Sequence, residues 1–293
     1  MFQLARIGPR FAMAVLLAVA PLAARAAASD WRGDARAEVR VITATDSVHG
    51  DTLDVGVEFR YPAGWHGYWR TPGDTGIAPR FDWSASHNVA SASVSWPAPS
   101  RLVIDGLQNS IYTGDFILPV KIRLTQPHQA TRIALMLDYA TCANVCVPEH
   151  AALSVDLREG PGAPSSEAQA LATALRTVPG TPAQAGIRVT RSSIEATRTG
   201  RPRLSIELHS AASAFQSPDL FVEGAGAGLP AAPRVQLSEH GRHARLEVDL
   251  PPTTTRTAPL RLTVVDGARA ATFAGPAVAT PASATHASIN GSL

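Results

Sequence analysis

The stretch Ile133–Leu157, IALMLDYATCANVCVPEHAALSVDL, decides the fold, and it holds both cysteines of the chain, Cys142 and Cys146. Apolar and polar side chains alternate before and after these cysteines, with the period of two that is typical of half-buried strands. The apolar members are Ile133, Leu135, Leu137, Tyr139, Leu153, Val155 and Leu157. Only Ala143, Asn144 and Val145 separate the two cysteines, few enough for a hairpin loop. The stretch therefore predicts an antiparallel β-hairpin with a cysteine at the loop end of each strand.

The register of this hairpin follows from pairing the two runs about Asn144. Apolar residues then face each other, and so do opposite charges, which is the pairing that stabilises a sheet. A shift by one residue would place the apolar set of one strand beside the polar set of the other. The resulting pairs are Ile133–Val155, Leu135–Leu153, Arg132–Asp156 and Asp138–His150. Cys142 and Cys146 become directly opposed, with Cα atoms about 4.5–5.5 Å apart, within reach of a disulfide. The sequence thus predicts a close, reversible dithiol.

Residues 1–28 are predicted to be a secretory signal peptide. Arg6 and Arg10 precede an apolar run, Phe11–Ala24, and small residues that suit the peptidase follow it. The alternative is a retained membrane anchor, although the run is short for a span, and no other stretch approaches about 20 apolar residues. We therefore expect an exported, soluble protein in a compartment where cysteine pairs are oxidised unless something reduces them.

The charge balance argues against a nucleic-acid partner. The whole chain has a formal net charge of +2, but three of its arginines lie within residues 1–26. Without them, 23 basic side chains stand against 24 acidic ones. This balance indicates neither a basic nucleic-acid face nor a polybasic membrane patch.

The remaining length, about 265 residues, is enough for two domains with their own cores. Short alternating runs recur about every 8–15 residues with turn signals between them, a pattern typical of antiparallel β-sandwiches. We predict an all-β protein with a first sandwich over 29–160, a linker with a helix over 161–184, a second sandwich over 185–276 and a disordered tail over 277–293. The first sandwich is expected to fold alone. Because both cysteines lie in it, loss of the second is expected to leave the cysteine chemistry intact.

The predicted elements are as follows. In the first half the strands are Ala37–Thr45, Thr52–Tyr61, Arg80–Trp83, Val89–Trp96 and Leu118–Thr125, followed by the cysteine hairpin. In the second half they are Gly186–Ser193, Arg203–His209, Leu220–Val222, Arg234–Leu237, Ala244–Leu250, Leu260–Val265 and Ala270–Phe273. The helix is Ser165–Val178, capped by Ser165 or Ser166 and ended by Pro179-Gly180.

Several motifs together resemble a known family. They are GWHGYWRTPGDTGIAPRFDW (64–83), SWPAPSR (95–101), IYTGDFILPVKI (111–122) and DYATCANVCVPEH (138–150). In this order they resemble the periplasmic N-terminal module of the thiol-disulfide interchange proteins DsbD and, more closely, ScsB. The resemblance covers about residues 30–160 and extends more loosely to 161–275, since ScsB-type modules carry a second immunoglobulin-like domain. It implies two immunoglobulin-like β-sandwiches and a location in the periplasm.

The resemblance also implies an electron relay. The cysteine pair would receive electrons from a transmembrane DsbD/ScsB-type donor and pass them to a periplasmic thioredoxin-like protein, with no cofactor. Carried over, Cys142 and Cys146 are the redox pair, and Cys146 forms the mixed disulfide with the oxidised partner. Tyr139 and Pro148 match the tyrosine before the first cysteine and the proline after the second. From the predicted register we add Asp138 and His150 as a weak base near the pair.

Three features depart from DsbD. The cysteines are separated by three residues instead of five, and the aromatic cap that shields them in DsbD is replaced by Leu102–Gln108 (LVIDGLQ). The residues that we predict to shield the cysteines are Leu102, Asp105, Leu107 and Tyr112. Gly106 would let this loop move. The transmembrane hub and the thioredoxin-like domain of DsbD are not in this sequence, so the donor is expected to be a separate protein.

Three alternatives remain open. The cysteines could form a plain stabilising disulfide, although so small a loop contributes only about 2 kcal/mol in the chain-entropy description. They could bind Cu(I) in a copper-tolerance protein, with His150 and Met136 on the same strand face, because thiolate, imidazole and thioether are ligands that Cu(I) accepts. The two sandwiches could also form an adaptor that only docks a partner.

Overall fold

The cysteine hairpin organises the first domain of the computed structural model, which describes residues 27–198, 201–226, 228–252 and 259–277. Strand β10 (Thr131–Cys142) pairs with β11 (Cys146–Leu157) over all twelve residues of each strand. The register is the predicted one: Ile133 faces Val155, Asp138 faces His150 and Cys142 faces Cys146. The local pairing of apolar with apolar and acid with base is sufficient to fix it.

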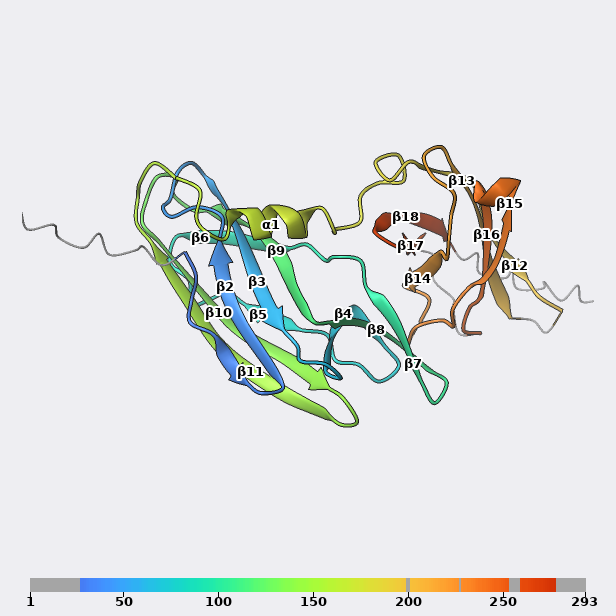
Figure 1. Ribbon diagram of the computed structural model, residues 1–293, viewed down its shortest axis with the longest axis horizontal. Coiled ribbons are helices and arrows are strands. Elements are labelled where there is room, and N and C mark those ends of the chain that lie inside the picture. Colours follow the sequence, from blue (N-terminus) through green and yellow to red (C-terminus); the bar gives the residue numbers. More distant parts are fainter. Residues whose placement is uncertain (1–26, 199–200, 227, 253–258, 278–293) are drawn as a thin grey trace, which may run out of the picture.

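Two sheets pack face to face in the first domain (Figure 1). One sheet has the order β1-β2-β3-β9-β6, and the other has the order β11-β10-β4-β8-β7, with β5 paired beside β10. The strands not yet given are β1 (Arg32–Asp34), β2 (Ala37–Thr43), β3 (Thr52–Arg60), β4 (His66–Gly73), β5 (Arg80–Asp82), β6 (Val89–Val94), β7 (Ser100–Ile104), β8 (Leu107–Thr113) and β9 (Asp115–Leu124). The cysteines lie in the second sheet, next to β4.

The core of the first domain consists of the inward-facing residues of both sheets. Val41 and Val57 from one sheet, and Ile133 and Leu135 from the other, are all 1 % exposed or less. Trp69 is fully buried among them, and three further tryptophans pack at the edge of this core.

The second domain repeats the sandwich design with fewer strands. Its sheets have the orders β12-β13-β16-β15 and β14-β17-β18, and each pair of neighbouring strands is antiparallel. A separate apolar core fills the space between them. The strands are β12 (Ile187–Ala196), β13 (Pro202–Ser210), β14 (Asp219–Glu223), β15 (Arg234–Ser238), β16 (His243–Asp249), β17 (Pro259–Asp266) and β18 (Arg269–Ala277), with a short 3-10 turn, η1 (Glu239–Gly241). The all-β, immunoglobulin-like fold class is confirmed.

The linker helix α1 (Ala168–Leu175) is shorter at both ends than the predicted Ser165–Val178. The predicted cap is also wrong in detail, because Glu167 occupies the N-cap position without a side-chain hydrogen bond. The Ser165 hydroxyl still accepts a hydrogen bond from the Glu167 N–H and donates to the carbonyl oxygen of Thr43. These bonds hold the start of α1 against β2. Leu171, 1 % exposed, fixes the helix over β3 and β9 of the first domain (Figure 1).

Every predicted strand is present, but four strands were not predicted: β1, β4, β7 and β8. Three of these, β4, β8 and β7, lie in the sheet of the cysteines. Most of the predicted signal peptide and of the tail, residues 1–26 and 278–293, lies outside the described residues. Among the helices that the structure describes, none is long and apolar enough to cross a membrane.

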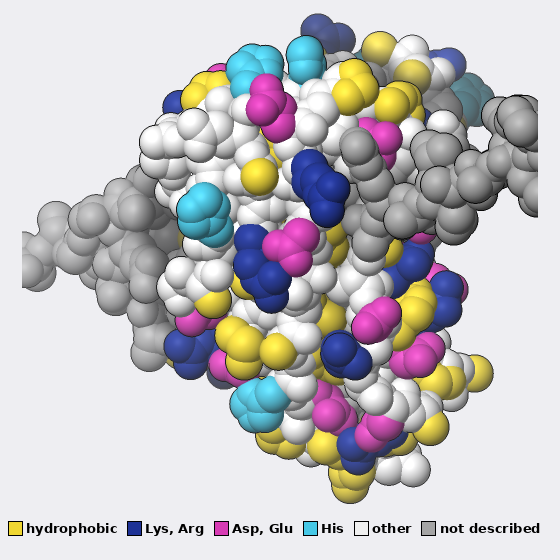
Figure 2. Space-filling view, turned by 90° about the vertical axis from the view of Figure 1, so that its left-hand side faces the viewer, with side chains coloured by type: hydrophobic (Ala, Val, Ile, Leu, Met, Phe, Trp, Pro, Cys, Tyr) yellow, Lys and Arg dark blue, Asp and Glu magenta, His cyan; other side chains and the backbone are white. Residues whose placement is uncertain are grey.

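The end of the first domain that lies farthest from the second carries mixed charges. Acidic and basic side chains alternate over this face, together with histidines, and neither sign forms a continuous patch (Figure 2). This distribution agrees with the near-neutral charge balance of the sequence, and it gives no indication of a nucleic-acid surface on this face.

Candidate functional site

The two sulfur atoms of the cysteine hairpin are bonded to each other, and they differ in their access to solvent. Cys142 and Cys146 form a disulfide across the end of the hairpin, with Cα atoms 4.1 Å apart. Cys142 is fully buried because β10 is flanked by β4 at this point. Cys146 begins the edge strand β11 and is exposed. An attacking thiolate therefore has direct access to Cys146 and not to Cys142.

Tyr68, on β4, contacts both sulfur atoms. Its hydroxyl group donates a hydrogen bond to Sγ of Cys142 at 3.1 Å and lies 3.4 Å from Sγ of Cys146. The side chain is 4 % exposed, and this burial raises the pKa of the phenol. The hydroxyl therefore keeps its proton at neutral pH and remains a donor. A donor at this distance is suited to stabilise a thiolate that forms on Cys142 when the disulfide opens.

His66 is the imidazole nearest to the disulfide in the sheet. It is the direct cross-strand partner of Cys142, and its ring packs edge-on against Tyr68 with centroids 5.5 Å apart. The side chain is 7 % exposed, and burial lowers the pKa of its imidazole. A neutral imidazole therefore lies beside the buried cysteine, where it adds no positive charge at neutral pH.

Strands β7 and β8 cover the buried side of the disulfide. Ile111 and Leu102 pack with Tyr68 and Cys142 in a small apolar cluster. The predicted loop Leu102–Gln108 is in fact mostly strand, because Asp105 and Gly106, both with positive φ, form a two-residue turn between β7 and β8. A two-residue Asp-Gly turn of this kind closes a tight hairpin.

The residues that we predicted as a shield are divided by this hairpin. Leu102 lies against the cysteine cluster, but Leu107 is 43 % exposed at the tip of the hairpin, and Asp105 is an exposed residue of the turn. Tyr112 lies in the core between the two sheets, where its hydroxyl donates to the carbonyl oxygen of Pro97. Neighbouring residues of a strand point to opposite faces, so Tyr112 cannot share the face of Ile111.

The segment between β4 and β5 also covers the site. Gly76 lies so close to the ring of Tyr68 that an added Cβ would be 2.4 Å from a ring carbon. Thr75 holds this segment in place, since its N–H and its hydroxyl both donate to Oδ1 of Asn109 on β8, at 3.2 and 2.9 Å. The tyrosine that contacts the sulfur atoms is thus enclosed by two strands and one loop.

The accessory residues from the sequence lie farther from the sulfur atoms. Nδ1 of His150 and Oδ1 of Asp138 are 2.5 Å apart, as the register predicts, but both side chains are largely exposed. Each is four residues along its strand from the nearer cysteine, about 13 Å at the usual rise per residue. Pro148 is exposed on the edge strand opposite Ala140. Tyr139 belongs to the core, where burial and the nearby Glu149 carboxylate raise its pKa to about 12.

The four residues of the copper alternative are spread along one strand face. Met136 is six residues from Cys142, about 20 Å along β10, and His150 is about 13 Å from Cys146 along β11. A single ion binds sulfur and nitrogen ligands at about 2.0–2.3 Å, so this arrangement does not bring the four ligands together. Within the part of the chain that the structure describes, no group of three or more His, Cys, Asp or Glu side chains has the geometry of a metal site.

Tyr68 and His66, which contact or face the cysteines directly, were not predicted from the sequence. A signal for them was present in the motif GWHGYWR, because His66, Tyr68 and the intervening Gly67 have the alternation of a strand. Two glycines and Pro72 near this run weaken its strand propensity. The pairing of His66 with Cys142 joins residues 76 positions apart, and no local pattern predicts such a contact.

The comparisons with known proteins agree with this geometry. The family model of the N-terminal part of thiol:disulfide interchange protein DsbD matches residues 38–157. Residues 38–157 are a DsbD-type N-terminal domain. The family model of a domain of unknown function matches residues 177–280. No curated protein sequence matches the chain.

The solved structures extend the fold to both domains. The crystal structure of the N-terminal periplasmic domain of ScsB from Proteus mirabilis superposes with a TM-score of 0.69 at 20 % sequence identity. The match covers 87 % of this chain and 99 % of that chain. The two-domain fold is therefore shared with that protein, and the first domain is a DsbD/ScsB-like module for thiol-disulfide interchange that carries the Cys142–Cys146 disulfide.

Proposed function

We propose that this protein relays electrons through the Cys142–Cys146 pair, from a membrane-bound reductase to a thioredoxin-like protein. The observation that carries the proposal is the asymmetry of the disulfide: Cys146 is exposed at a sheet edge, and Cys142 is buried beside the hydroxyl of Tyr68. This arrangement supports attack at Cys146 and departure of Cys142. It matches the expectation, from the family resemblance, that Cys146 forms the mixed disulfide.

The chemistry consists of two thiol-disulfide exchanges. A partner thiolate attacks Sγ of Cys146, a new bond joins the two proteins, and the bond to Cys142 breaks. The Cys142 thiolate, next to the Tyr68 hydroxyl, then takes up a proton. The partner's second thiolate attacks the partner's own bonded sulfur, which releases Cys146 as a thiolate that is also protonated. The pair has gained two electrons and two protons, and the partner dithiol has become a disulfide.

The same steps in reverse reduce an oxidised thioredoxin-like protein. The reduced pair attacks through Cys146, and Cys142 resolves the mixed disulfide by attacking Cys146. In the described part of β11 the first charged side chain is the partly buried Glu149, three residues from Cys146, so we expect the partner to supply the more reactive thiol. The pair then acts as an intermediate that exchanges with selected partners.

We place this reaction in the periplasm. The N-terminal sequence supports export, and the solved relative is described as a periplasmic domain. An oxidising compartment would keep the pair as the disulfide unless a reductase supplied electrons. A transmembrane donor of the DsbD/ScsB type fits this requirement, with a periplasmic thioredoxin-like protein as the acceptor.

The reduction potential separates a redox pair from a structural disulfide. The purified chain is equilibrated with mixtures of reduced and oxidised glutathione, and the free thiols are then trapped with a maleimide and counted by mass. Because Cys142 and Cys146 are the only cysteines, the count is unambiguous. We expect a midpoint potential above about −300 mV, since structural disulfides generally lie below that value. A midpoint below it, or a pair that does not equilibrate, would overturn the proposal.

A further inference from the structure

Two of the strands that shield Cys142, β4 and β7, also contact the second domain. In Figure 1, β4, β8 and β7 lie on the side of the first domain that faces the second. Alternate residues of these strands serve the two contacts. Leu102 packs in the cysteine cluster, while the preceding Arg101 reaches into the second domain. Tyr68 contacts the sulfur atoms, while the following Trp69 packs against the ring of Phe221, with centroids 5.9 Å apart.

Arg101 makes the densest of these contacts. Its side chain is 8 % exposed, and Nε and Nη2 donate to the two carboxylate oxygens of Asp219 at 2.9 and 3.0 Å. Nη1 and Nη2 also donate to the carbonyl oxygens of Pro230 and Leu220, each at 2.9 Å. A further bond, from Nη1 to Oε1 of Gln108 at 3.2 Å, ties β8 to the same guanidinium group. All five N–H donors of this buried cation are therefore used, and removal of the carboxylate would leave its charge unpaired.

Two further groups hold the strands next to Arg101. Arg70 donates through Nε and Nη2 to the carboxylate of Glu223 at 2.9 and 2.8 Å, and the hydroxyl of Thr71 donates to the same carboxylate. Asp74 accepts a bond from the N–H of Gln108 at 2.7 Å and one from the N–H of Leu229 at 3.3 Å. The second domain thus binds the end of β4 and Asp74, which precedes the loop over Tyr68, and Asp74 in turn binds the start of β8.

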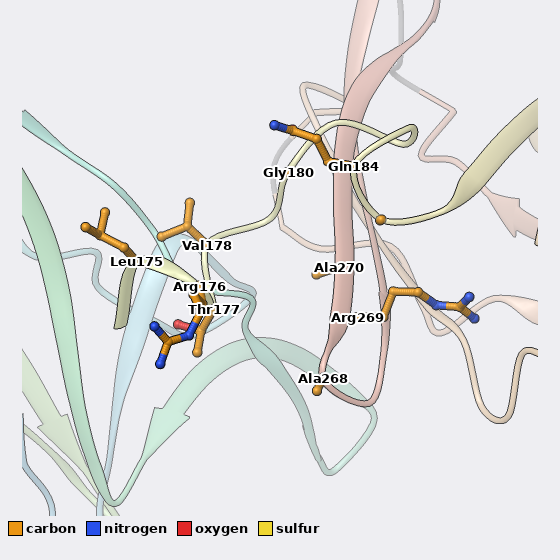
Figure 3. A pocket seen from close by; sticks show the side chains of 10 residues that line it. Leu175, Arg176, Thr177, Val178, Gly180, Gln184, Ala268, Arg269 and Ala270 are labelled. Carbon is orange, nitrogen blue, oxygen red and sulfur yellow. The ribbon is translucent and has the colours of Figure 1, made fainter. Parts of the chain in front are cut away.

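The connection through the linker is less tightly packed. A hollow of about 390 Å³ separates Leu175–Val178, at the end of α1, from Ala268–Ala270, at the start of β18 (Figure 3). The chain crosses to the second domain beside this hollow, where Gly180 accepts a hydrogen bond from the N–H of Thr272. The close contact of the two domains is therefore on the β4–β8–β7 side.

We propose that the second domain controls access to the disulfide by holding β4, β7 and β8 against Cys142, with Arg101 and Asp219 as the main positioning residues. The contact passes from Asp219 to Arg101, then along β7 to the neighbouring Leu102, and so to the cluster around Cys142. Loosening the domain contact would let Tyr68 and Leu102 move away from the sulfur atoms more often. This inference rests on the proposed function, because it concerns regulation of the same disulfide.

The test compares carboxylate-to-amide variants of the full chain. In Asp219→Asn, and in Asp219→Asn combined with Glu223→Gln, the buried guanidinium groups lose their counter-charges while the fold of each domain is otherwise preserved. We measure the rate at which iodoacetamide alkylates the Cys142 thiol when each variant also carries Cys146→Ser. Cys142 is the buried sulfur, so this rate reports on the shield, and it should rise by about fivefold or more, the lower end of measured couplings between sites. The rise should already be present without urea, far from the unfolding transition, which global unfolding of a merely destabilised domain would not show.

Two further variants complete the test. Glu58→Gln removes a comparably buried carboxylate, which pairs with Arg40 at 2.6 Å on the other sheet, and it should leave the alkylation rate unchanged. Asp219→Glu keeps the charge and should restore most of the slow rate.

If the variants unfold, the inference is tested on the wild type by amide hydrogen exchange in subdenaturing urea. The amides of β7 and β8 should then lose protection at the same urea concentration as those of β14. Rates equal to those of the wild type in Asp219→Asn, or separate opening of β14, would overturn the inference. The glutathione titration of the wild type tests the relay independently.

Discussion

At the scale of single residues, the disulfide is placed so that its two sulfur atoms have different roles. The exposed Cys146 is available to a partner, and the buried Cys142 has the Tyr68 hydroxyl as its nearest donor. His66 completes this surrounding as a neutral, desolvated imidazole opposite Cys142. Neither the Tyr68 hydroxyl nor the His66 imidazole carries a charge at neutral pH. The site therefore selects Cys142 as the leaving sulfur mainly by its burial and by one hydrogen bond.

The first prediction concerns the hydroxyl of Tyr68. In Tyr68→Phe the ring still covers Cys142, but the donor to the departing thiolate is lost. Reduction by dithiothreitol should slow about tenfold, since a hydrogen bond to a charged group contributes about 1.5 kcal/mol. Tyr112→Phe is the matched control, because its hydroxyl donates to Pro97 in the core, and it should leave the rate unchanged. A faster or unchanged rate in Tyr68→Phe would remove the hydroxyl from the mechanism.

The second prediction concerns the pH dependence of stability. Burial lowers the pKa of His66 in the folded protein below the unfolded value of about 6.5. Between these two values the unfolded chain binds a proton that the folded chain does not, so the free energy of unfolding falls as the pH falls through this window. Urea unfolding at pH 7 and pH 5 should show a smaller loss in His66→Gln than in the wild type. His150→Gln, at an exposed site, should keep the wild-type loss. Equal losses in all three proteins would contradict the assignment to His66.

At the scale of elements, two β-hairpins and the strand between them form the site. The β10–β11 hairpin places the sulfur atoms, and the β7–β8 hairpin with β4 covers one of them. The two hairpins are built differently. The first is fixed by twelve cross-strand pairs, and the second is a short hairpin closed by Asp105 and Gly106 with exposed apolar residues at its tip. The second hairpin is therefore the part of the site that we expect to move.

The third prediction separates the two leucines of the β7–β8 hairpin. Leu102→Ala removes packing from the cluster around Cys142, whereas Leu107→Ala shortens a side chain that is already 43 % exposed. Reoxidation of the reduced protein by a small disulfide reagent should be several-fold faster in Leu102→Ala and unchanged in Leu107→Ala. If the two variants reacted at the same rate, the hairpin would not be the shield.

The cysteine hairpin could be predicted in full from the sequence because its contacts are local and its pattern regular. The covering strands could not, since the pairing of His66 with Cys142 and of Tyr68 with Ile111 joins distant segments. Two other features, the Asp105-Gly106 turn and the face of Tyr139, do follow from local patterns. An Asp-Gly pair between two apolar runs predicts a two-residue hairpin turn. Tyr139 is three residues from Cys142, so the period of two already assigned it to the opposite face.

At the scale of the whole molecule, the two domains share one contact surface. Phe221 and Leu229 of the second domain, 1 % and 5 % exposed, belong to the core cluster of the first. From the sequence, loss of the second domain was expected to leave the cysteine chemistry intact, because both cysteines lie in the first domain. The ion pairs of Arg70 and Arg101 now give a physical reason to expect the opposite.

The fourth prediction concerns the isolated first domain. A fragment of residues 29–178, which keeps α1 and its buried Leu171, should fold but melt at a lower temperature than the full chain. The loss arises because Trp69 no longer packs on Phe221 and Arg101 loses its carboxylate partner. When the fragment also carries Cys146→Ser, its Cys142 thiol should be alkylated faster by iodoacetamide than that of the full chain. Circular dichroism and the alkylation rate check both points, and a fragment with the melting temperature and rate of the full chain would contradict them.

The relay itself is tested most directly by trapping a mixed disulfide. Cys142→Ser and Cys146→Ser are each mixed with a thioredoxin-like protein in its oxidised form, and the covalent complex is measured on a non-reducing gel. Cys142→Ser retains the exposed thiol and lacks the one that resolves the complex, so it should accumulate the mixed disulfide, while Cys146→Ser should form far less. Equal trapping by the two variants, or trapping only through Cys142, would contradict a relay that operates through the exposed sulfur of Cys146.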